Sequence, residues 1–334
     1  MIVTGGAGLI GSACIWLLNR RGIEDIIVVD RLDESEKWKH LVPLRFADYV
    51  DADDFGEVIA SDPKAFGTIG TVLHLGACSA TTETDSDYLI RNNYEYTKQL
   101  AQWAVNAGAR FVYASSAATY GALEDGLSDR APLRSLRPLN MYAYSKHLFD
   151  LYAARTGLSS KIAGLKYFNV FGPNEDHKGD MRSIVFKAFE QITMTGSVRL
   201  FKSYRPDFRD GEQRRDFVYV KDAVEMTLFV AESNLTGLIN VGSGSTHTWL
   251  DLVRPIFETL GLAESVEFID MPATLRGKYQ YSTRAEMNTL RAAGYDRPET
   301  SLYDAVGDYV KNYLVPGRVL DPSDASALNT LTVS

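Results

Sequence analysis

Thr4-Gly5-Gly6-Ala7-Gly8-Leu9-Ile10-Gly11 lies between a short apolar run and a stretch whose apolar residues recur at helical spacing. Gly5, Gly8 and Gly11 allow a sharp turn and a close approach of the backbone to a pyrophosphate, and a helix start offers free amide groups to that anion. The helix is predicted to close at 20–22, where two arginines precede a glycine. A tight β–α turn could use these glycines for packing alone, but their context predicts a dinucleotide-binding loop.

An acidic residue stands where the adenosine ribose of a dinucleotide would lie. Asp30 ends the apolar run 26–30 and follows Gly11 by 19 residues. A carboxylate at this place binds the ribose hydroxyls and favours NAD. Arg31 and Lys37, just beyond it, favour NADP, because cationic side chains hold a 2′-phosphate.

Short β-branched runs alternate with amphipathic stretches in the first half of the chain. Residues 26–30, 71–75 and 111–115 are predicted to be buried strands, a further strand is expected at 237–242, and a helix at 250–260. The expected fold class is α/β: a Rossmann-type doubly wound parallel sheet with a smaller C-terminal α/β substrate lobe. The expected parts are a dinucleotide-binding domain over 1–172 with a return at about 214–244, a substrate-binding lobe over 173–213 and 245–315, and a flexible tail over 316–334.

Composition excludes several classes of protein. The 334 residues carry a formal net charge of −8 and no long basic stripe, which argues against nucleic acid as a partner. No apolar run reaches the roughly 18 residues of a membrane span, and no signal peptide is recognised at Met1, so no membrane partner is expected. Cys14 and Cys78 are too few for a disulfide framework. A cytoplasmic protein is therefore expected.

Three residues form a predicted catalytic set. Tyr142 and Lys146 are four apart, which places both side chains on one face of a helix. A nearby ammonium is expected to lower the pKa of the tyrosine, so that the phenol exchanges a proton with a sugar hydroxyl during hydride transfer. Ser116, at the end of the strand 111–115, is expected to hydrogen-bond the same oxygen.

Together these motifs resemble the extended short-chain dehydrogenase/reductases of the NAD-dependent epimerase/dehydratase family. Longer strings, between about residue 1 and about residue 314, are similar to the ADP-L-glycero-D-manno-heptose 6-epimerase family within it. The most discriminating string is His177-Lys178-Gly179, which related sugar-nucleotide enzymes generally lack. The other strings are Gly76-Ala77-Cys78-Ser79, Asn92-Asn93-Tyr94, Ala114 to Gly121, Tyr167-Phe168-Asn169-Val170, Arg215 to Val220, Gly277-Lys278-Tyr279-Gln280 and Leu290 to Tyr295.

The resemblance implies an isomerase that inverts C6″ of ADP-D-glycero-D-manno-heptose through a transient ketone, in the synthesis of a lipopolysaccharide inner-core precursor. It implies that Tyr142 and Lys178 are the acid/base residues, supported by Lys146 and Ser116. It also implies NADP as cofactor, with NAD possible, and a homo-oligomer such as a pentamer. The implied cofactor contacts are Gly5, Gly8, Leu9, Ile10, Gly11, Asp30, Arg31, Lys37, Leu75, Gly76, Ala77, Cys78, Ser79, Asn92, Lys146, Val170 and Lys178. The implied substrate contacts are Ser116, Asn169, Asp180, Lys187, Phe201, Arg215 and Tyr279.

Some positions depart from the family pattern. Asp180 and Lys187 stand where a small hydroxyl residue and a histidine are expected, and the segment 202–214 is longer than expected. A second basic residue expected near Ala52 is missing, which weakens the case for NADP. No metal is expected, because no Cys, His or carboxylate cluster has metal-site spacing, and His177 is interpreted as a structural neighbour of Lys178.

Two other functions remain as alternatives, and a third is rejected. A UDP-sugar 4-epimerase is the main alternative, because it uses the same Tyr and Ser but would not need Lys178. A non-catalytic NADP-binding regulator is a weaker one, since such proteins tend to lose the Tyr142 and Lys146 that this chain keeps. A 4,6-dehydratase is rejected, because Ala117-Ala118 occupy the positions of its Asp-Glu pair.

Overall fold

A computed structural model describes residues 1–276 and 279–324, so Gly277 and Lys278 of one family string and residues 325–334 of the expected tail lie outside the described residues. A seven-stranded parallel sheet with the order β11-β6-β5-β4-β1-β2-β3 forms the larger part. This arrangement confirms the predicted α/β class and Rossmann-type sheet. The strands are β1 Ile2–Thr4, β2 Ile27–Asp30, β3 Asp48–Asp51, β4 Thr71–His74, β5 Arg110–Ser116, β6 Ala163–Tyr167 and β11 Gly237–Val241.

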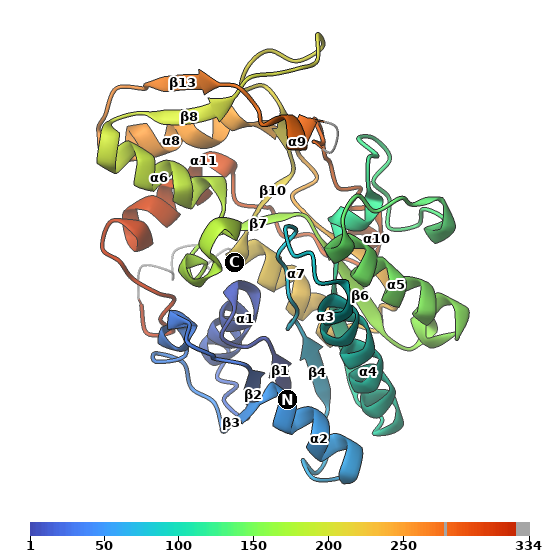
Figure 1. Ribbon diagram of the computed structural model, residues 1–334. Helices are drawn as coiled ribbons and strands as arrows, with labels where there is room; N and C mark the ends of the chain where they lie inside the picture. Colours follow the sequence, from blue (N-terminus) through green and yellow to red (C-terminus); the bar gives the residue numbers. More distant parts are fainter. Residues whose placement is uncertain (277–278, 325–334) are drawn as a thin grey trace.

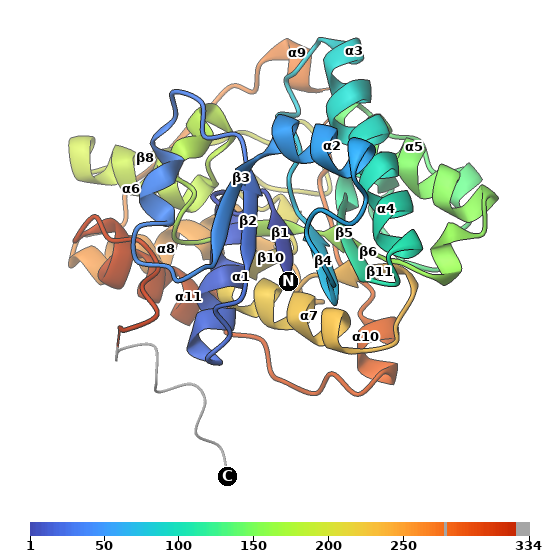
Figure 2. The same cartoon turned by 90° about the horizontal axis from the view of Figure 1, so that it is seen from below.

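Apolar side chains point alternately to the two faces of the sheet, so that helices pack on both faces. Val3 and Val112 pack on one face with the helices α1 Leu9–Arg20 and α7 Val220–Glu232. Ile2 and Phe111, their neighbours in sequence, pack on the other face with α2 Ala52–Ser61, α4 Tyr96–Asn106 and α5 Met141–Arg155. Figure 2 shows these two helical layers with the strands between them. Because each such side chain contributes about 1.5–3 kcal/mol when fully buried, this period-2 pattern holds the sandwich together.

The order of the strands creates a crevice at the carboxyl ends of the central strands. From β1 the chain first adds β2 and β3 on one side, and then crosses to β4, β5 and β6 on the other. Ligands of open parallel sheets bind outside the carboxyl ends of the strands at this switch point. The site is therefore expected beyond the ends of β1 and β4.

Three two-stranded sheets belong to the second half of the chain. They pair β7 Asn169–Phe171 with β10 Phe217–Tyr219, β9 Arg214–Arg215 with β12 His247–Thr248, and β8 Val198–Phe201 with β13 Val266–Ile269. In Figure 1 the β8–β13 pair lies at the upper left with its helices, away from β1 to β4. The helices of this half are α6 Ile184–Thr195, α8 Trp249–Leu260, α9 Ala273–Arg276, α10 Asn288–Ala292 and α11 Leu302–Tyr309.

Short helical segments complete the fold. The short helix α3 Ser86–Leu89 runs through a π-helical turn at Ile90–Glu95 into α4. Two 3₁₀ turns, η1 Glu36–His40 and η6 Asp176–Met181, approach each other beside the glycine-rich loop. Within residues 1–276 and 279–324, no helix has the length and apolar character required to cross a membrane.

The segment after residue 316 is packed on the molecule as far as the structure describes it. Leu320 is fully buried and its N–H donates to Asn174 Oδ1 at 3.0 Å. Trp16 Nε1 of α1 donates to the carbonyl oxygen of Asp321 at 3.2 Å. Within the tail expected from residue 316, one apolar side chain and two hydrogen bonds therefore hold residues 320 and 321 against the rest of the molecule.

Candidate functional site

A cavity of about 450 Å³ opens at the switch point of the sheet, beyond the ends of β1, β4 and β5. It brings together the glycine-rich loop, the predicted catalytic residues and the His177-Lys178-Gly179 segment, which lie far apart in the sequence. Of the residues predicted from sequence, those that line it are Gly5, Gly8, Leu9, Ile10, Gly11, Asp30, Lys37, Leu75, Gly76, Ala77, Ser79, Ser116, Tyr142, Lys146, Asn169, Val170 and Lys178.

The glycine-rich loop has the geometry of an anion cradle. A Cβ atom on Gly5, whose φ is +67°, would lie 2.5 Å from the backbone nitrogen of Gly76, and one on Gly11 would lie 2.0 Å from the carbonyl oxygen of Gly5. Gly8 is the N-cap of α1 and supplies no side-chain cap to the first-turn amides. These amides, at Leu9 and Ile10, border the cavity, so the loop fits the pyrophosphate of a dinucleotide.

The ribose end of the cavity pairs each basic residue with a carboxylate. Asp30 accepts hydrogen bonds from the Ala7 N–H at 2.8 Å and from Lys37 Nζ at 2.9 Å. Arg31 binds Asp53 through two nitrogens, at 3.0 and 2.5 Å, and donates to Asn92 Oδ1 at 2.6 Å. Arg31 and Asn92 line a neighbouring surface pocket, not the main cavity. The two predicted cations are therefore balanced by two anions.

Cys78 is the third predicted cofactor contact that does not line the main cavity. Its backbone N–H donates to Asn93 Oδ1 at 2.9 Å and its carbonyl oxygen accepts from Asn93 Nδ2 at 2.9 Å. These two hydrogen bonds hold the loop after β4, whose residues Leu75, Gly76 and Ala77 do line the cavity. The role of Cys78 in this structure is thus to fix the cavity wall.

Tyr142 and Lys146 lie one turn apart on α5, as their spacing predicts. Burial raises the pKa of Tyr142 above its usual value, and a hydrogen bond with Ser116 opposes this only in part. In the chain alone the net shift of the Tyr142 pKa is therefore upward, opposite in direction to the shift expected from Lys146. Burial also lowers the pKa of Lys146 to about 8, against the effect of the negative Asp150.

Asp150 belongs to a buried polar network that the sequence analysis missed. Asp150, buried and one turn beyond Lys146 on α5, accepts hydrogen bonds from Tyr113 Oη and Ser115 Oγ, each at 2.8 Å. Lys166 Nζ, also buried, lies 3.3 Å from Asp150 Oδ2. The signal that could have identified Asp150 is its spacing, because Tyr142, Lys146 and Asp150 recur every four residues on one helix face.

Lys178 lies on η6, which is held by the residues just before it. Asn174 Nδ2 donates to Ser12 Oγ of α1 at 2.9 Å, and the buried Glu175 accepts from the backbone N–H and the hydroxyl of Ser183, each at 2.6 Å. Burial lowers the pKa of Lys178, Glu175 raises it and Lys187 lowers it. A lysine with a lowered pKa at the edge of the cavity gives up its proton more readily than an exposed lysine, which suits proton transfer.

A second cavity, of about 560 Å³, adjoins the first and shares Ile184 and Trp249 with it. Three residues predicted to bind substrate, Lys187, Phe201 and Tyr279, line it. A long ligand can therefore reach from Tyr142 in the first cavity into the second.

Arg215 and Asp180, also predicted to bind substrate, line neither cavity. Arg215 is buried beside this second cavity, with its guanidinium 5.0 Å from the Tyr279 ring centre, and it donates to the carbonyl oxygens of Arg214 and Gln280. Asp180 is exposed, and its backbone carbonyl oxygen accepts a hydrogen bond from Lys187 Nζ at 2.5 Å.

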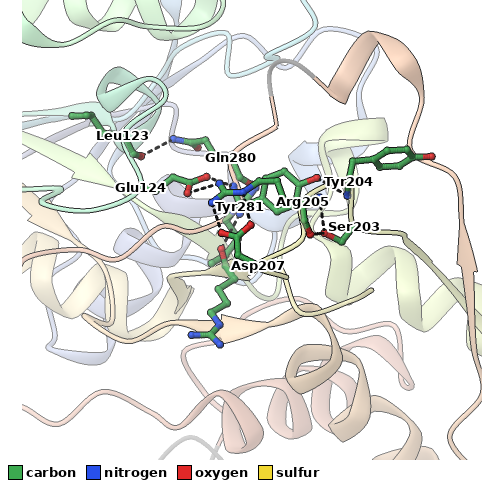
Figure 3. A network of polar contacts seen from close by, with 10 residues as sticks. Leu123, Glu124, Ser203, Tyr204, Arg205, Asp207, Gln280 and Tyr281 are labelled. Carbon is green, nitrogen blue, oxygen red and sulfur yellow. Dashed lines mark hydrogen bonds and ion pairs between the residues drawn. The ribbon is translucent and has the colours of Figure 1, made fainter. Parts of the chain in front are cut away.

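The long segment 202–214 is fastened to residues 279–281, next to the cavity-lining Tyr279. Figure 3 shows Arg205 between Glu124 and Asp207, with Tyr281 beside it. Arg205 Nη1 lies 2.7 Å from Glu124 Oε2, while Glu124 Oε1 accepts the backbone N–H of Tyr281 at 2.8 Å. The Tyr281 hydroxyl in turn accepts the N–H of Tyr204 at 3.0 Å. The segment thus joins the loop after β5 to residues 279–281.

Replacing Arg205 by alanine is expected to loosen both ends of this connection. Amide hydrogen exchange in peptides covering 203–208 and 279–282 should accelerate roughly fivefold, because the variant loses the partly exposed ion pair with Glu124 that joins the two, along with the local pair to Asp207. Arg199→Ala is the matched control, because Arg199 forms an exposed ion pair with Glu267 outside this network. Equal exchange rates in the Arg205 variant and the natural chain would show that the connection does not depend on Arg205.

Comparisons with known proteins give a consistent set of similarities. Residues 1–242 match the NAD dependent epimerase/dehydratase family. An ADP-L-glycero-D-manno-heptose-6-epimerase of Nitratidesulfovibrio vulgaris strain DP4 is 52% identical over 315 residues, which cover 94% of this chain and 97% of the relative. One from Fusobacterium nucleatum is 45% identical over 325 residues, covering 94% and 98%.

Solved structures extend these similarities to three dimensions. The crystal structure of the Helicobacter pylori ADP-L-glycero-D-manno-heptose-6-epimerase has a TM-score of 0.79 at 25% identity and covers 93% of this chain and 94% of its own. The Thermus thermophilus UDP-glucose 4-epimerase in complex with NAD has a TM-score of 0.74 at 27% identity, with 95% and 99% coverage.

Proposed function

Because the chain belongs to the NAD dependent epimerase/dehydratase family and, within it, to the ADP-L-glycero-D-manno-heptose-6-epimerases, we propose that its cavity inverts C6″ of ADP-D-glycero-D-manno-heptose. The product, ADP-L-glycero-D-manno-heptose, is a precursor of the lipopolysaccharide inner core. The observation that carries the proposal is the meeting of Tyr142 and Lys178 in one cavity with a glycine-rich cradle.

Two proton-transfer groups suit an inversion through a ketone. A nicotinamide dinucleotide held by the glycine-rich loop and Lys146 would supply a hydride acceptor for C6″ and would return the same hydride, and its positive charge would favour the phenolate of Tyr142. One of Tyr142 and Lys178 removes the proton of the C6″ hydroxyl as the ketone forms. The other returns a proton to the ketone oxygen after the sugar has turned its opposite face. Ser116 holds the phenol oxygen of Tyr142 in place during both half-reactions.

The second cavity would hold the ADP part of the substrate. Phe201 and Tyr279 offer aromatic faces to the adenine, and Lys187 a positive charge to the diphosphate. Arg215, buried beside Tyr279, suits bidentate binding of a phosphate, provided that it exchanges its present carbonyl partners for the ligand. This division puts the heptose at the shared boundary of the two cavities, near Ile184 and Trp249.

We further propose that the cofactor is NADP, with NAD as the alternative. Lys37 and Arg31 lie beside Asp30 at the ribose end, and a 2′-phosphate would replace Asp53 as a partner of Arg31. Because Asp30 and Asp53 already balance these cations, cofactor released by denaturing the purified protein should be identified directly. Recovery of NAD instead of NADP would correct the cofactor and leave the epimerase function unaffected.

The experiment that tests the function is incubation of the purified protein with ADP-D-glycero-D-manno-heptose in heavy water, without added cofactor. NMR at C6″ is expected to show an approach to a mixture of the two epimers, with the original hydrogen retained. Deuterium at C6″ would point to deprotonation of carbon and overturn the ketone route. No change, even with NADP or NAD added, would favour a UDP-sugar 4-epimerase.

A further inference from the structure

His40 connects the glycine-rich loop to the segment that carries Lys178. It ends the 3₁₀ turn η1, and its side chain is fully buried. Its ring lies beside that of His177, with the centres 5.1 Å apart. The sequence analysis did not single out His40, because nothing in the sequence places residue 40 near residues 176–178.

Both ring nitrogens of His40 face atoms that can only accept a hydrogen bond. Nδ1 lies 2.7 Å from the carbonyl oxygen of Ala7, and Nε2 lies 2.7 Å from Asp176 Oδ1. A carbonyl oxygen and a carboxylate have no proton to donate, so each short contact requires the proton to be on the imidazole. A ring that donates from both nitrogens is the imidazolium, and its bond to Asp176 is a charge-assisted hydrogen bond.

A proton fits this geometry better than a metal ion, although His40, Asp176 and His177 hold three potential ligand atoms within 4.8 Å. Two ligands of a tetrahedral zinc ion, with bonds of about 2.0–2.1 Å, are roughly 3.3 Å apart. The 2.7 Å between His40 Nε2 and Asp176 Oδ1 is shorter and has the length of a hydrogen bond.

The neighbouring charges agree with this assignment. Burial by itself would raise the pKa of Asp176, but the hydrogen bond and the positive charge of His40 hold it below its usual value. The pKa of His177 is lowered to about 4, first by burial and then by the charge of His40, so His177 is neutral near pH 7.

A continuous row of hydrogen bonds runs through His40. Lys37 donates to Asp30, Asp30 accepts the N–H of Ala7, and the carbonyl oxygen of Ala7 accepts from His40. His40 then donates to Asp176, two residues before Lys178. The row thus connects Asp30, the carboxylate expected to meet the cofactor ribose, to the segment that carries Lys178, the second proposed acid/base residue.

We propose that His40 is a positioning residue, held as an imidazolium, that fixes η6 against the glycine-rich loop and so places Lys178 at the cavity. The inference rests on the proposed role of Lys178 in the epimerase. His40 itself does not line the cavity that holds Tyr142. It acts through its hydrogen bond to Asp176.

The connection is expected to weaken as the pH rises. Loss of the Nε2 proton leaves a lone pair facing the carboxylate, so one of the two hydrogen bonds becomes a repulsion. Of the charged and titratable groups near this ring, Asp176 on η6 faces Nε2 directly and His177 on η6 lies beside it. Lys178 on η6 and Lys37 on η1 act on the neighbouring His177, and Asp30 on β2 is paired with Lys37.

The first test is ¹⁵N NMR of protein labelled at its five histidines. At pH 7.5 one histidine is expected to show both nitrogens protonated, and this signal should disappear in His40→Gln. In Asp176→Asn the amide can donate to a neutral ring, so the same histidine should carry a single proton at pH 7.5. An unprotonated His40 nitrogen in the natural chain at pH 7.5 would overturn the inference. This measurement needs no substrate and so is independent of the proposed function.

The second test is kinetic. His40→Gln is expected to lower kcat on ADP-D-glycero-D-manno-heptose about tenfold, with a smaller change in KM, since Lys178 lies on η6 itself whereas the proposed ADP cavity is bonded to η6 through the Asp180 carbonyl oxygen. Asp176→Asn should keep most of the activity and lose less of it between pH 7 and 9 than the natural chain. Lys39→Gln, an exposed neighbour on η1, is the control. Unchanged kcat in a folded His40→Gln variant would refute the positioning role.

Discussion

Replacing Tyr142 by phenylalanine, or Lys178 by methionine, is expected to lower kcat by at least about 10²-fold, the typical contribution of a general acid or base. Each variant keeps the bulk of the side chain and loses only the group that exchanges a proton. The measurement is the rate of approach to the mixture of C6″ epimers, followed by NMR, with bound cofactor quantified in the same samples.

The control for Lys178→Met is Lys161→Met, because Lys161 is exposed and follows the turn Leu158–Ser160, outside both cavities. Normal cofactor content in the two slow variants would place the defect in chemistry, not in binding. Full activity of Lys178→Met would refute the two-base mechanism and leave Tyr142 as the single acid/base residue, as the UDP-sugar 4-epimerase alternative requires.

The second large effect concerns the buried pair beneath the catalytic residues. Asp150→Asn is expected to lower the free energy of unfolding by about 3–5 kcal/mol, because it leaves the Lys166 ammonium in the core without its carboxylate. Tyr113 donates to Oδ1 of Asp150 and Ser115 to Oδ2, so the single amide oxygen of asparagine can keep only one of these two hydrogen bonds, and the loss combines the charge with one hydrogen bond. Urea unfolding at pH 7 tests this, and Asp150→Asn/Lys166→Met should recover much of the loss.

The same variant should also change the pH dependence of catalysis. The Asp150 carboxylate supports the ammonium of Lys146, whose pKa burial lowers to about 8. Removing that negative charge lowers the Lys146 pKa further, so the fall of kcat on the alkaline side should begin at a lower pH. A variant as stable as the natural chain, with an unchanged pH profile, would show that Asp150 and Lys166 do not act as a buried ion pair.

Local patterns predicted the sheet and much of its cavity. The runs 26–30, 71–75, 111–115 and 237–242 each overlap a strand of the seven-stranded sheet, because β-branched residues in short apolar runs are a local signal. The helix expected at 250–260 spans Trp249–Leu260. The glycine-rich loop could be predicted for the same reason, since its turn, its strand and its helix are adjacent in the sequence.

Contacts between distant segments could not be predicted. The ion pair between Arg31 and Asp53 depends on how the chain after β2 meets the start of α2. The raised pKa of Tyr142 depends on burial, which spacing along a helix does not reveal. The hydrogen bond between His40 and Asp176 joins residues 136 positions apart. In each case the residue type was visible in the sequence and its partner was not.

The packing of Leu320 has a consequence for how the molecule is made. Asn174, which holds η6 through Ser12, also accepts the backbone N–H of Leu320, and the neighbouring bond from Trp16 to Asp321 spans 305 positions. During synthesis on the ribosome, the parallel sheet can assemble once β11 has emerged, but this last support of Asn174 is missing until residue 320 is released. A nascent chain can therefore acquire its parallel sheet well before the segment that carries Lys178 is secured.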